Sequence, residues 1–323
     1  MKTSPRSLYL HVALAVGLLA GSQAANAQAL NYQNYNAIIF NDLNTTSDIE
    51  GRTFVGHDFT GTNSANLGNH LSNSVPANDR SFVVGNNLFG GNSINMQRGS
   101  LYIDGSTNGR GINYNGGGST VVDHTIDSST ATIKAYSIAQ SQALAALTPD
   151  SYATFPTTTP GPTLFHTVND GDGVAVFNVS AANIFNNPYG QQFDIVWDGF
   201  TSDIVINVSG TTVNWQNGNM VGLFNDNKWQ SHTIWNFYEA TSITLQNNFK
   251  GAILAPLASI TAHSNIDGLV VANNLTTQHE VHLPNDGNAY DGYTAAAPEP
   301  GSALLILALG GVVLVARNRR LLI

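Results

Sequence analysis

The stretch Ser81-Phe82-Val83-Val84-Gly85-Asn86-Asn87-Leu88 is the clearest of a series of short apolar runs that decide the fold class. A β-prone run bounded by Gly and Asn is typical of a short strand followed by a tight turn. The same pattern occurs at residues 35–40, 53–56 and 101–105. Short strands at fairly regular spacing predict a sandwich, a barrel or a β-solenoid, and the lack of a strict repeat length leaves all three open.

The second half of the chain continues the strand pattern. Residues 203–208 alternate apolar and polar side chains, as a half-buried strand does. In a solenoid, a glycine would supply the left-handed conformation at each corner, Ala255-Pro256 would stop a strand, and Asn amides would stack between levels. The expected corners are Gly56, Gly85, Gly105, Gly251 and Gly268.

Residues 127–147 break the β pattern and predict one helix. Asp127 or Ser128 is expected to cap its start, and Thr148-Pro149-Asp150 to end it. An apolar stripe at helical spacing predicts the face that packs on the β core. Its members are Ile133, Tyr136, Ala143, Leu144 and Leu147.

The C-terminus has three parts in a fixed order. Pro298-Glu299-Pro300 precedes an uncharged apolar run at residues 303–316, and Arg317, Arg319 and Arg320 follow as a basic stop. Read from physics alone, this layout fits a membrane anchor with its arginines on the cytoplasmic side.

The N-terminus has the layout of a secretory signal peptide. Lys2 and Arg6 form a basic region, and residues 8–20 form an apolar one. Ala25 and Ala27 satisfy the small-residue rule for cleavage. We expect export, with a mature chain that begins at Gln28.

The three-part tail resembles the PEP-CTERM sorting signal of Gram-negative bacteria. The resemblance implies recognition by an exosortase, cleavage near Pro298-Glu299-Pro300, and release to the cell surface or an exopolysaccharide matrix. The apolar run would then hold the chain at the inner membrane only until processing.

The charge balance restricts the partners of the exported body. Of 12 basic residues, five lie in the two ends, against one of 21 acidic residues, so residues 28–297 carry a formal charge of −13. Such a surface repels nucleic acid and anionic lipid. The chain has no cysteine, which excludes disulfides, a thiol nucleophile and Cys-ligated zinc.

A second resemblance covers about residues 31–290. Trp235-Asn236-Phe237, Gly251-Ala252-Ile253-Leu254-Ala255-Pro256 and Ile266-Asp267-Gly268 look like the C-terminal half of a choice-of-anchor A domain. Ile49-Glu50-Gly51-Arg52 fits its N-terminal half. The resemblance implies an adhesive, non-enzymatic domain that is mainly β, folded as a right-handed β-helix with one accessory helix.

The expected organisation therefore has four segments. They are a signal helix at residues 1–27, an adhesive β domain at 28–292, a short linker at 293–297 and a hydrophobic sorting segment at 298–323. The expected partners are the exosortase, the secretion machinery and a glycan or surface ligand. A structural matrix protein without a defined ligand is the alternative.

Little in the sequence indicates catalysis or a metal. Asp170 and Asp172 alternate as in a calcium loop, but the EF-hand pattern lacks its closing acid, and a plain turn is favoured. The spacing of His279 and His282 does not fit a zinc-protease helix. No cofactor is expected. For a polysaccharide-degrading enzyme on a β-helix, the first acids to test are Asp194, Asp198 and Asp203.

Tryptophans supply a possible adhesive mechanism, because aromatic faces stack on sugar rings. Trp215 and Trp229 lie among Asn, Gly and Gln, which predicts surface positions for both. Trp197 and Trp235 are expected in the core.

Overall fold

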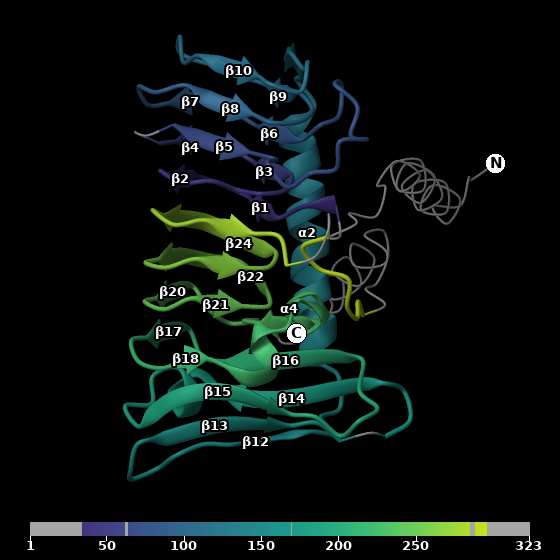
Figure 1. Cartoon of the computed structure of the whole chain (residues 1–323), viewed down its shortest axis with the longest axis vertical. Coiled ribbons are helices and arrows are strands. Elements are labelled where there is room, and N and C mark those ends of the chain that lie inside the picture. Colours follow the sequence, from purple (N-terminus) through teal and green to yellow (C-terminus); the bar gives the residue numbers. More distant parts are fainter. Residues whose placement is uncertain (1–33, 62–63, 169, 285–287, 296–323) are drawn as a thin grey trace, which may run out of the picture. The chain divides into compact units, whose positions relative to one another are not determined.

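The computed structural model describes residues 34–61, 64–168, 170–284 and 288–295. The fold is mainly β with few helices, and nearly all of its strand pairs are parallel (Figure 1). The longest path through the main sheet runs, in spatial order, through β11 (Thr120–Val122), β9 (Leu101–Ile103), β6 (Phe82–Val84), β3 (Thr53–Val55), β1 (Ala37–Ile39), β24 (Val270–Thr277), β22 (Ala252–Ala262), β19 (Thr233–Asn236), β16 (Asp203–Ser209) and β14 (Val174–Ser180).

Further strands stack beside this path in the same parallel manner. One branch of the main sheet contains β17 (Thr212–Trp215), β20 (Ser242–Leu245), the second halves of β22 and β24, β2 (Leu43–Thr45), β4 (Phe59–Thr60) and β7 (Leu88–Phe89). Two three-stranded sheets contain β5 (Ala65–Leu67), β8 (Ile94–Met96) and β10 (Ile112–Tyr114), and β21 (Phe249–Lys250), β23 (Ile266–Asp267) and β25 (Val281–His282).

The remaining elements gather near the middle of the sequence. A four-stranded sheet contains β12 (Tyr152–Thr154), β13 (Gly161–His166), β15 (Gly190–Val196) and β18 (Asn219–Met220), with β12 antiparallel to β13. The helices within the described residues are α2 (Ile126–Ala145), α3 (Ala181–Ile184), η2 (Gly222–Asn225) and α4 (Asn227–His232).

The order of the stack differs from the order of the sequence. β1 pairs with β3 on one side and with β24, more than 200 residues away, on the other (Figure 1). The strands from β1 to β11 form a first series, which stacks away from β1 in sequence order. After α2, the strands from β14 to β24 form a second series, which stacks back toward β1 and ends with β24 beside it. The first strand therefore joins the two series in the middle of one continuous sheet.

The core is formed by inward side chains from all sides of the stack. Ala37 and Ile39 belong to it, as do Val55, Val84 and Ile103 at equivalent positions on neighbouring strands. Toward β14 the core becomes aromatic, with several edge-on ring contacts, such as Phe165 on Trp235. The predicted core position of Trp235 is confirmed, since the residue is fully buried.

Helix α2 confirms the predicted helix, with a different cap and a different buried face. It starts after Thr125, whose backbone N–H donates to the Asp123 side chain, so neither Asp127 nor Ser128 is the cap. Of the predicted apolar stripe only Leu144 is buried; the other buried residues are Ile126, Ser137, Gln140 and Ser141.

The polar face of α2 is explained by what lies opposite it. Asn207 and Asn236, on neighbouring strands, are buried and joined by a 2.8 Å hydrogen bond from the Asn236 amide. The amides also donate to main-chain carbonyls of α2, at Leu144 and Ser141 respectively. Buried amides need hydrogen-bond partners, and the helix supplies them. The predicted stacking of Asn amides between levels is thereby confirmed.

The predicted glycine corners require glycine for two different reasons. Gly251 and Gly268 have positive φ, at 104° and 150°. At Gly56, Gly85 and Gly105 φ is not in the left-handed region, so that expectation is wrong there; a Cβ would instead collide with a carbonyl oxygen of the neighbouring level. The prediction that Ala255-Pro256 stops a strand is also wrong. β22 continues through both residues, with a shift of register against β24.

Both expected terminal signals lie outside the described residues. This applies to Ala25 and Ala27, to Pro298-Glu299-Pro300 and to the arginines at 317, 319 and 320. Among the described residues, no helix is both long and apolar enough to cross a membrane.

Candidate functional site: a hydroxyl and amide face

One side of the stack exposes a regular array of small polar side chains. It is formed by β17, β20, the second halves of β22 and β24, β2 and β4. We call this array the hydroxyl face. One row contains Thr212, Ser242, Ser259 and Asn274, and the other contains Asn214, Thr244, Thr261, Thr276, Asn44 and Thr60.

Alternation along the strands produces the face. Between the two rows, Val213, Ile243, Ile260 and Leu275 are in register and buried, which fixes their neighbours on the outside. Strands lie about 4.8 Å apart, and residues two apart along a strand lie about 6.7 Å apart. The hydroxyl face is thus a two-dimensional lattice of hydrogen-bonding groups, and none of the residues in its two rows is charged.

Hydrogen bonds hold part of this lattice in place. The Asn274 amide donates to the Ser259 hydroxyl at 2.9 Å and accepts from the Asn41 amide at 2.9 Å. Groups held in this way lose little further entropy when they bind a ligand.

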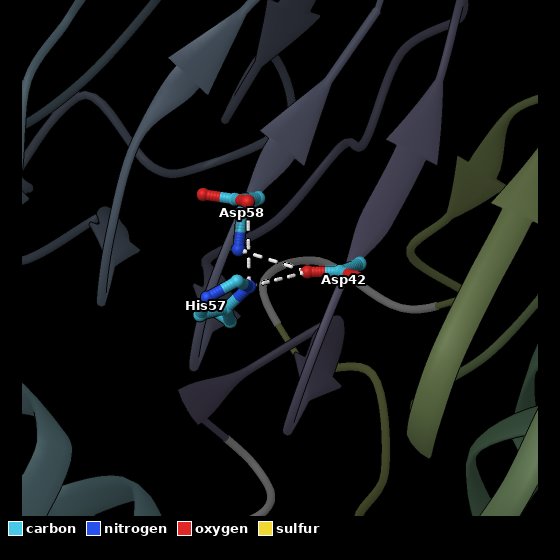
Figure 2. Close-up of side chains that lie close together, drawn as sticks. All are labelled: Asp42, His57 and Asp58. Carbon is cyan, nitrogen blue, oxygen red and sulfur yellow. Dashed lines mark hydrogen bonds and ion pairs between the residues drawn. The ribbon is translucent and has the colours of Figure 1, made fainter.

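The first row ends in charged residues beyond Asn274. Asp42 follows it in register on the chain segment that leads into β2, and it accepts from His57 Nδ1 at 2.7 Å (Figure 2). Asp58 lies 3.4 Å from the same nitrogen. The hydrogen bond to Asp42 is the main reason why the pKa of His57 is raised. The neutral lattice therefore ends at an acidic margin.

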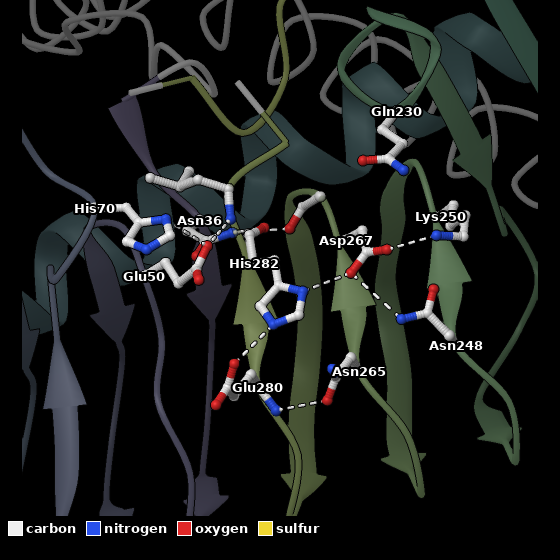
Figure 3. Close-up of polar contacts among 12 residues, drawn as sticks. Asn36, Glu50, His70, Gln230, Asn248, Lys250, Asn265, Asp267, Glu280 and His282 are labelled. Atoms are coloured by element: carbon white, nitrogen blue, oxygen red, sulfur yellow. Dashed lines mark hydrogen bonds and ion pairs between the residues drawn. The ribbon is translucent and has the colours of Figure 1, made fainter. Parts of the chain in front are cut away.

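A second polar side lies over β21, β23 and β25 (Figure 3). Lys250 Nζ lies 2.9 Å from Asp267, which accepts from His282 Nδ1 at 2.8 Å. His282 Nε2 lies 2.8 Å from the Glu280 carboxylate. These contacts raise the pKa of His282 to about 9, with the hydrogen bond to Asp267 as the largest cause.

The amide ladder next to these strands is electrically neutral over most of its length. Asn113 donates to Asn95, Asn95 donates to Asn66, and Asn66 donates to Asp48, at 2.8 to 3.1 Å. Each Asn side chain donates a hydrogen bond to the side chain on the neighbouring strand, so these bonds link β10, β8 and β5.

The exposed aromatic residues are not those that were predicted. Trp215 is fully buried and Trp229 is 3 % exposed, so the predicted surface positions of both are wrong. Trp215 stacks on Phe193 inside the core, because its position on β17 points inward. Trp197, expected in the core, is 45 % exposed, and its indole N–H donates to the Thr201 carbonyl.

Other aromatic rings lie exposed on the four-stranded sheet and in the loop that follows β15. Tyr152 is exposed and stacks on His166 with ring centroids 4.7 Å apart, and Phe200 is also exposed. The pairing of β12 with β13, which brings Tyr152 to His166, is a property of the fold.

The remaining residues singled out in the sequence have local structural contacts. Asp170 and Asp172 each accept a backbone N–H two residues further on, which is the geometry of a plain turn. Asp194 accepts from Leu223, Asp198 from Phe200 and Thr201, and Asp203 contacts His232 at 2.6 Å. The three acids thus have separate sets of partners.

The chain belongs to an adhesive-domain family. The family model described as "Putative Ice-binding-like adhesive domain" matches residues 29–283, most of the chain. Adhesive and ice-binding-like families of this kind are non-enzymatic. A PEP-CTERM protein-sorting motif matches residues 296–320, as predicted. Such signals indicate export and membrane-associated sorting, with processing by an exosortase.

The solved structures similar to this chain include ice-binding proteins. One from the Antarctic ascomycete Antarctomyces psychrotrophicus is 14% identical, covering 79% of this chain and 96% of that one, with a TM-score of 0.31. One from an Antarctic biological consortium is 15% identical, covering 77% and 86%, with a TM-score of 0.30. No curated protein matches the chain closely enough to count as a relative.

Proposed function

We propose that this chain is an exported, non-enzymatic adhesin that binds extended neutral glycans or solid surfaces through the hydroxyl face. The observation that carries the proposal is the uncharged lattice of Ser, Thr and Asn on paired strands. A repeating polymer can meet many such groups at once, so weak single contacts add up.

Composition and exposed rings favour a glycan over a charged ligand. The body is acidic, and hydroxyls and amides can hydrogen-bond to sugar hydroxyls without a charge on either partner. Trp197 and Tyr152, which lie outside the rows of the hydroxyl face, have exposed side chains that would contact sugars in place of the buried Trp215 and Trp229. An exopolysaccharide is the ligand that best agrees with PEP-CTERM sorting.

The proposal includes the finer features of the fold and of sorting. We take the stacked strands to form a right-handed β-helix, and the family to be choice-of-anchor A. We take the signal peptide to end at Ala27 and the tail to be cleaved near Pro298-Glu299-Pro300. The mature adhesive domain would then lie at the cell surface or in the matrix.

An equilibrium depletion assay with the processed protein tests this function. The panel contains the producing organism's exopolysaccharide, cellulose, an anionic polysaccharide and ice. We expect saturable binding to a neutral polysaccharide with little change between low and high salt, since the hydroxyl face has no charge to screen.

The other outcomes have different consequences. Binding to ice alone would exclude a glycan ligand and leave only the solid-surface form of the proposal, and binding to the anionic polysaccharide alone would exclude the neutral face as the site. Self-association without binding to any member of the panel would identify a structural matrix protein. Release of reducing sugar from any glycan would identify an enzyme.

A further inference from the structure

Three potential metal ligands converge on the polar side formed by β25. They are His282 Nε2 and carboxylate oxygens of Glu280 and Glu50, which all lie within 4.8 Å of one another (Figure 3). Glu50 is 7 % exposed, and the Leu283 N–H donates to it at 2.7 Å. His70 Nδ1 lies 3.1 Å from the same Glu50 oxygen, outside this group of three.

The orientation of His282 is set by a carboxylate behind the ring. Asp267 contacts His282 Nδ1 at 2.8 Å, and Lys250 contacts Asp267 at 2.9 Å. A carboxylate that holds one ring nitrogen and leaves the other for a metal is a recurring feature of zinc sites. The outer contact also sets which nitrogen is free to coordinate.

Electrostatics requires a positive charge between these ligands. A neutral ring that donates from Nδ1 to Asp267 presents a lone pair at Nε2, only 2.8 Å from a Glu280 oxygen. Two such atoms repel unless a proton or a cation lies between them. Two carboxylates and a neutral imidazole would balance the charge of a divalent ion.

We propose that Glu50, Glu280 and His282 form a binding site for a divalent transition metal of the zinc class. Mixed nitrogen and oxygen ligands suit Zn²⁺, which forms bonds of about 2.0 to 2.2 Å to them. The ion would displace the proton on His282 Nε2.

The place of the site gives the ion a structural role. Val281 forms a β-bridge with Ile49, so the site lies where the last strand of the returning series meets the first series. A metal there would join Glu50 to Glu280 and His282, which are 230 residues or more further along the chain. The protein has no cysteine and cannot form a disulfide, so the metal would provide the cross-link between these two distant segments.

Zinc titration of the processed protein, followed by calorimetry and thermal unfolding, tests the proposal. We expect one Zn²⁺ per chain and a melting temperature that rises with zinc. His282→Gln should abolish both effects, and Asp267→Asn should weaken binding by roughly 10- to 100-fold. Glu280→Gln, at a side chain that is 45% exposed, tests the ligand set with less risk to folding.

Two matched variants make the test specific. His279→Gln changes an exposed histidine three residues away and should leave the affinity unchanged. His57→Gln removes the ring beside Asp42 and Asp58, the other cluster of possible ligands in the described part of the chain. The proposal is overturned by an absence of saturable binding, by loss of binding in His57→Gln alone, or by unchanged binding in folded Glu280→Gln.

Discussion

At Gly85 a single missing side chain allows two levels of the stack to approach each other. A Cβ there would collide with the carbonyl oxygen of Gly56, and a Cβ at Gly56 would collide with that of Phe40. The sequence predicted that glycine matters at these points but gave the wrong reason at Gly56 and Gly85. Backbone conformation can be anticipated from a turn pattern, whereas contact with a neighbouring level exists only in the fold.

Substitution of Gly85 by Ala should therefore be costly although the backbone conformation is ordinary. We expect Gly85→Ala to lower the free energy of unfolding by about 1–3 kcal/mol, as overpacking does. Gly91→Ala is the matched control, because a Cβ at Gly91 would have no neighbour within 4 Å and its φ is not in the left-handed region. Urea unfolding of both variants checks this, and equal stabilities would refute the steric explanation.

Among individual side chains, tryptophans were the least predictable. Trp215 has polar sequence neighbours because it alternates with outward residues of β17, so its own position is inward. The same alternation could have located Trp215 in the core, had the strand been recognised. Trp197 follows the end of β15, where alternation no longer determines burial.

At the level of the elements, the strands and the helix were largely predictable, and their partners were not. Short runs with glycine and asparagine at their ends predict the strands, but no local feature of the sequence predicts that β1 pairs with β24. The helix was expected to bury an apolar stripe. It buries Ser141, whose hydroxyl donates to the Asn236 side chain, and Gln140, whose amide donates to the Ala295 carbonyl.

The start of α2 should respond to acid through Asp123. The Thr125 side chain, and then the Arg80 guanidinium, lower the pKa of Asp123 to about 2, against burial, which acts to raise it. Because the folded-state pKa is below the usual 3.8, the ionised carboxylate stabilises the fold above about pH 4, and this contribution is lost as the pH falls toward 2.

Asp123→Asn makes this contribution measurable. We expect the variant to be less stable than the wild type at pH 5, with the difference shrinking between pH 4 and pH 2. Thermal unfolding of both proteins across that range checks it. A difference that stays constant with pH would show that the charge of Asp123 does not stabilise the helix start.

For the whole molecule, the two ends of the sequence gave the clearest information on export and sorting, and the body gave the fold class. The family match agrees with the fold class, and the sorting motif agrees with the prediction from the C-terminal end. The hydroxyl face could not be read from the sequence, because its residues come from six strands that lie far apart in the chain. Only the register of those strands brings Asn44, Thr276 and Thr261 into one row.

Processing of the two ends is testable on the protein extracted from its source cells. Intact mass spectrometry should find a chain that begins at Gln28 and lacks residues 317–323, since the tail is a temporary anchor in this account. A surface-extracted protein that retains residues 317–323 would instead identify a permanent membrane anchor.

The central claim is that the hydroxyl face is the adhesive surface, and one substitution tests it most directly. Thr261 lies on β22 in register between Thr244 and Thr276, so a bulky ring there disrupts the middle of the lattice. Thr132, an exposed residue of α2 that is not part of the hydroxyl face, offers a matched control.

The measurement is the affinity of wild type, Thr261→Tyr and Thr132→Tyr for the neutral polysaccharide bound by the wild type, with thermal unfolding to confirm that all three are folded. We predict that Thr261→Tyr weakens binding by roughly tenfold or more, about 1.4 kcal/mol, and that Thr132→Tyr has no effect. Wild-type affinity in Thr261→Tyr, or an equal loss in Thr132→Tyr, would contradict the account.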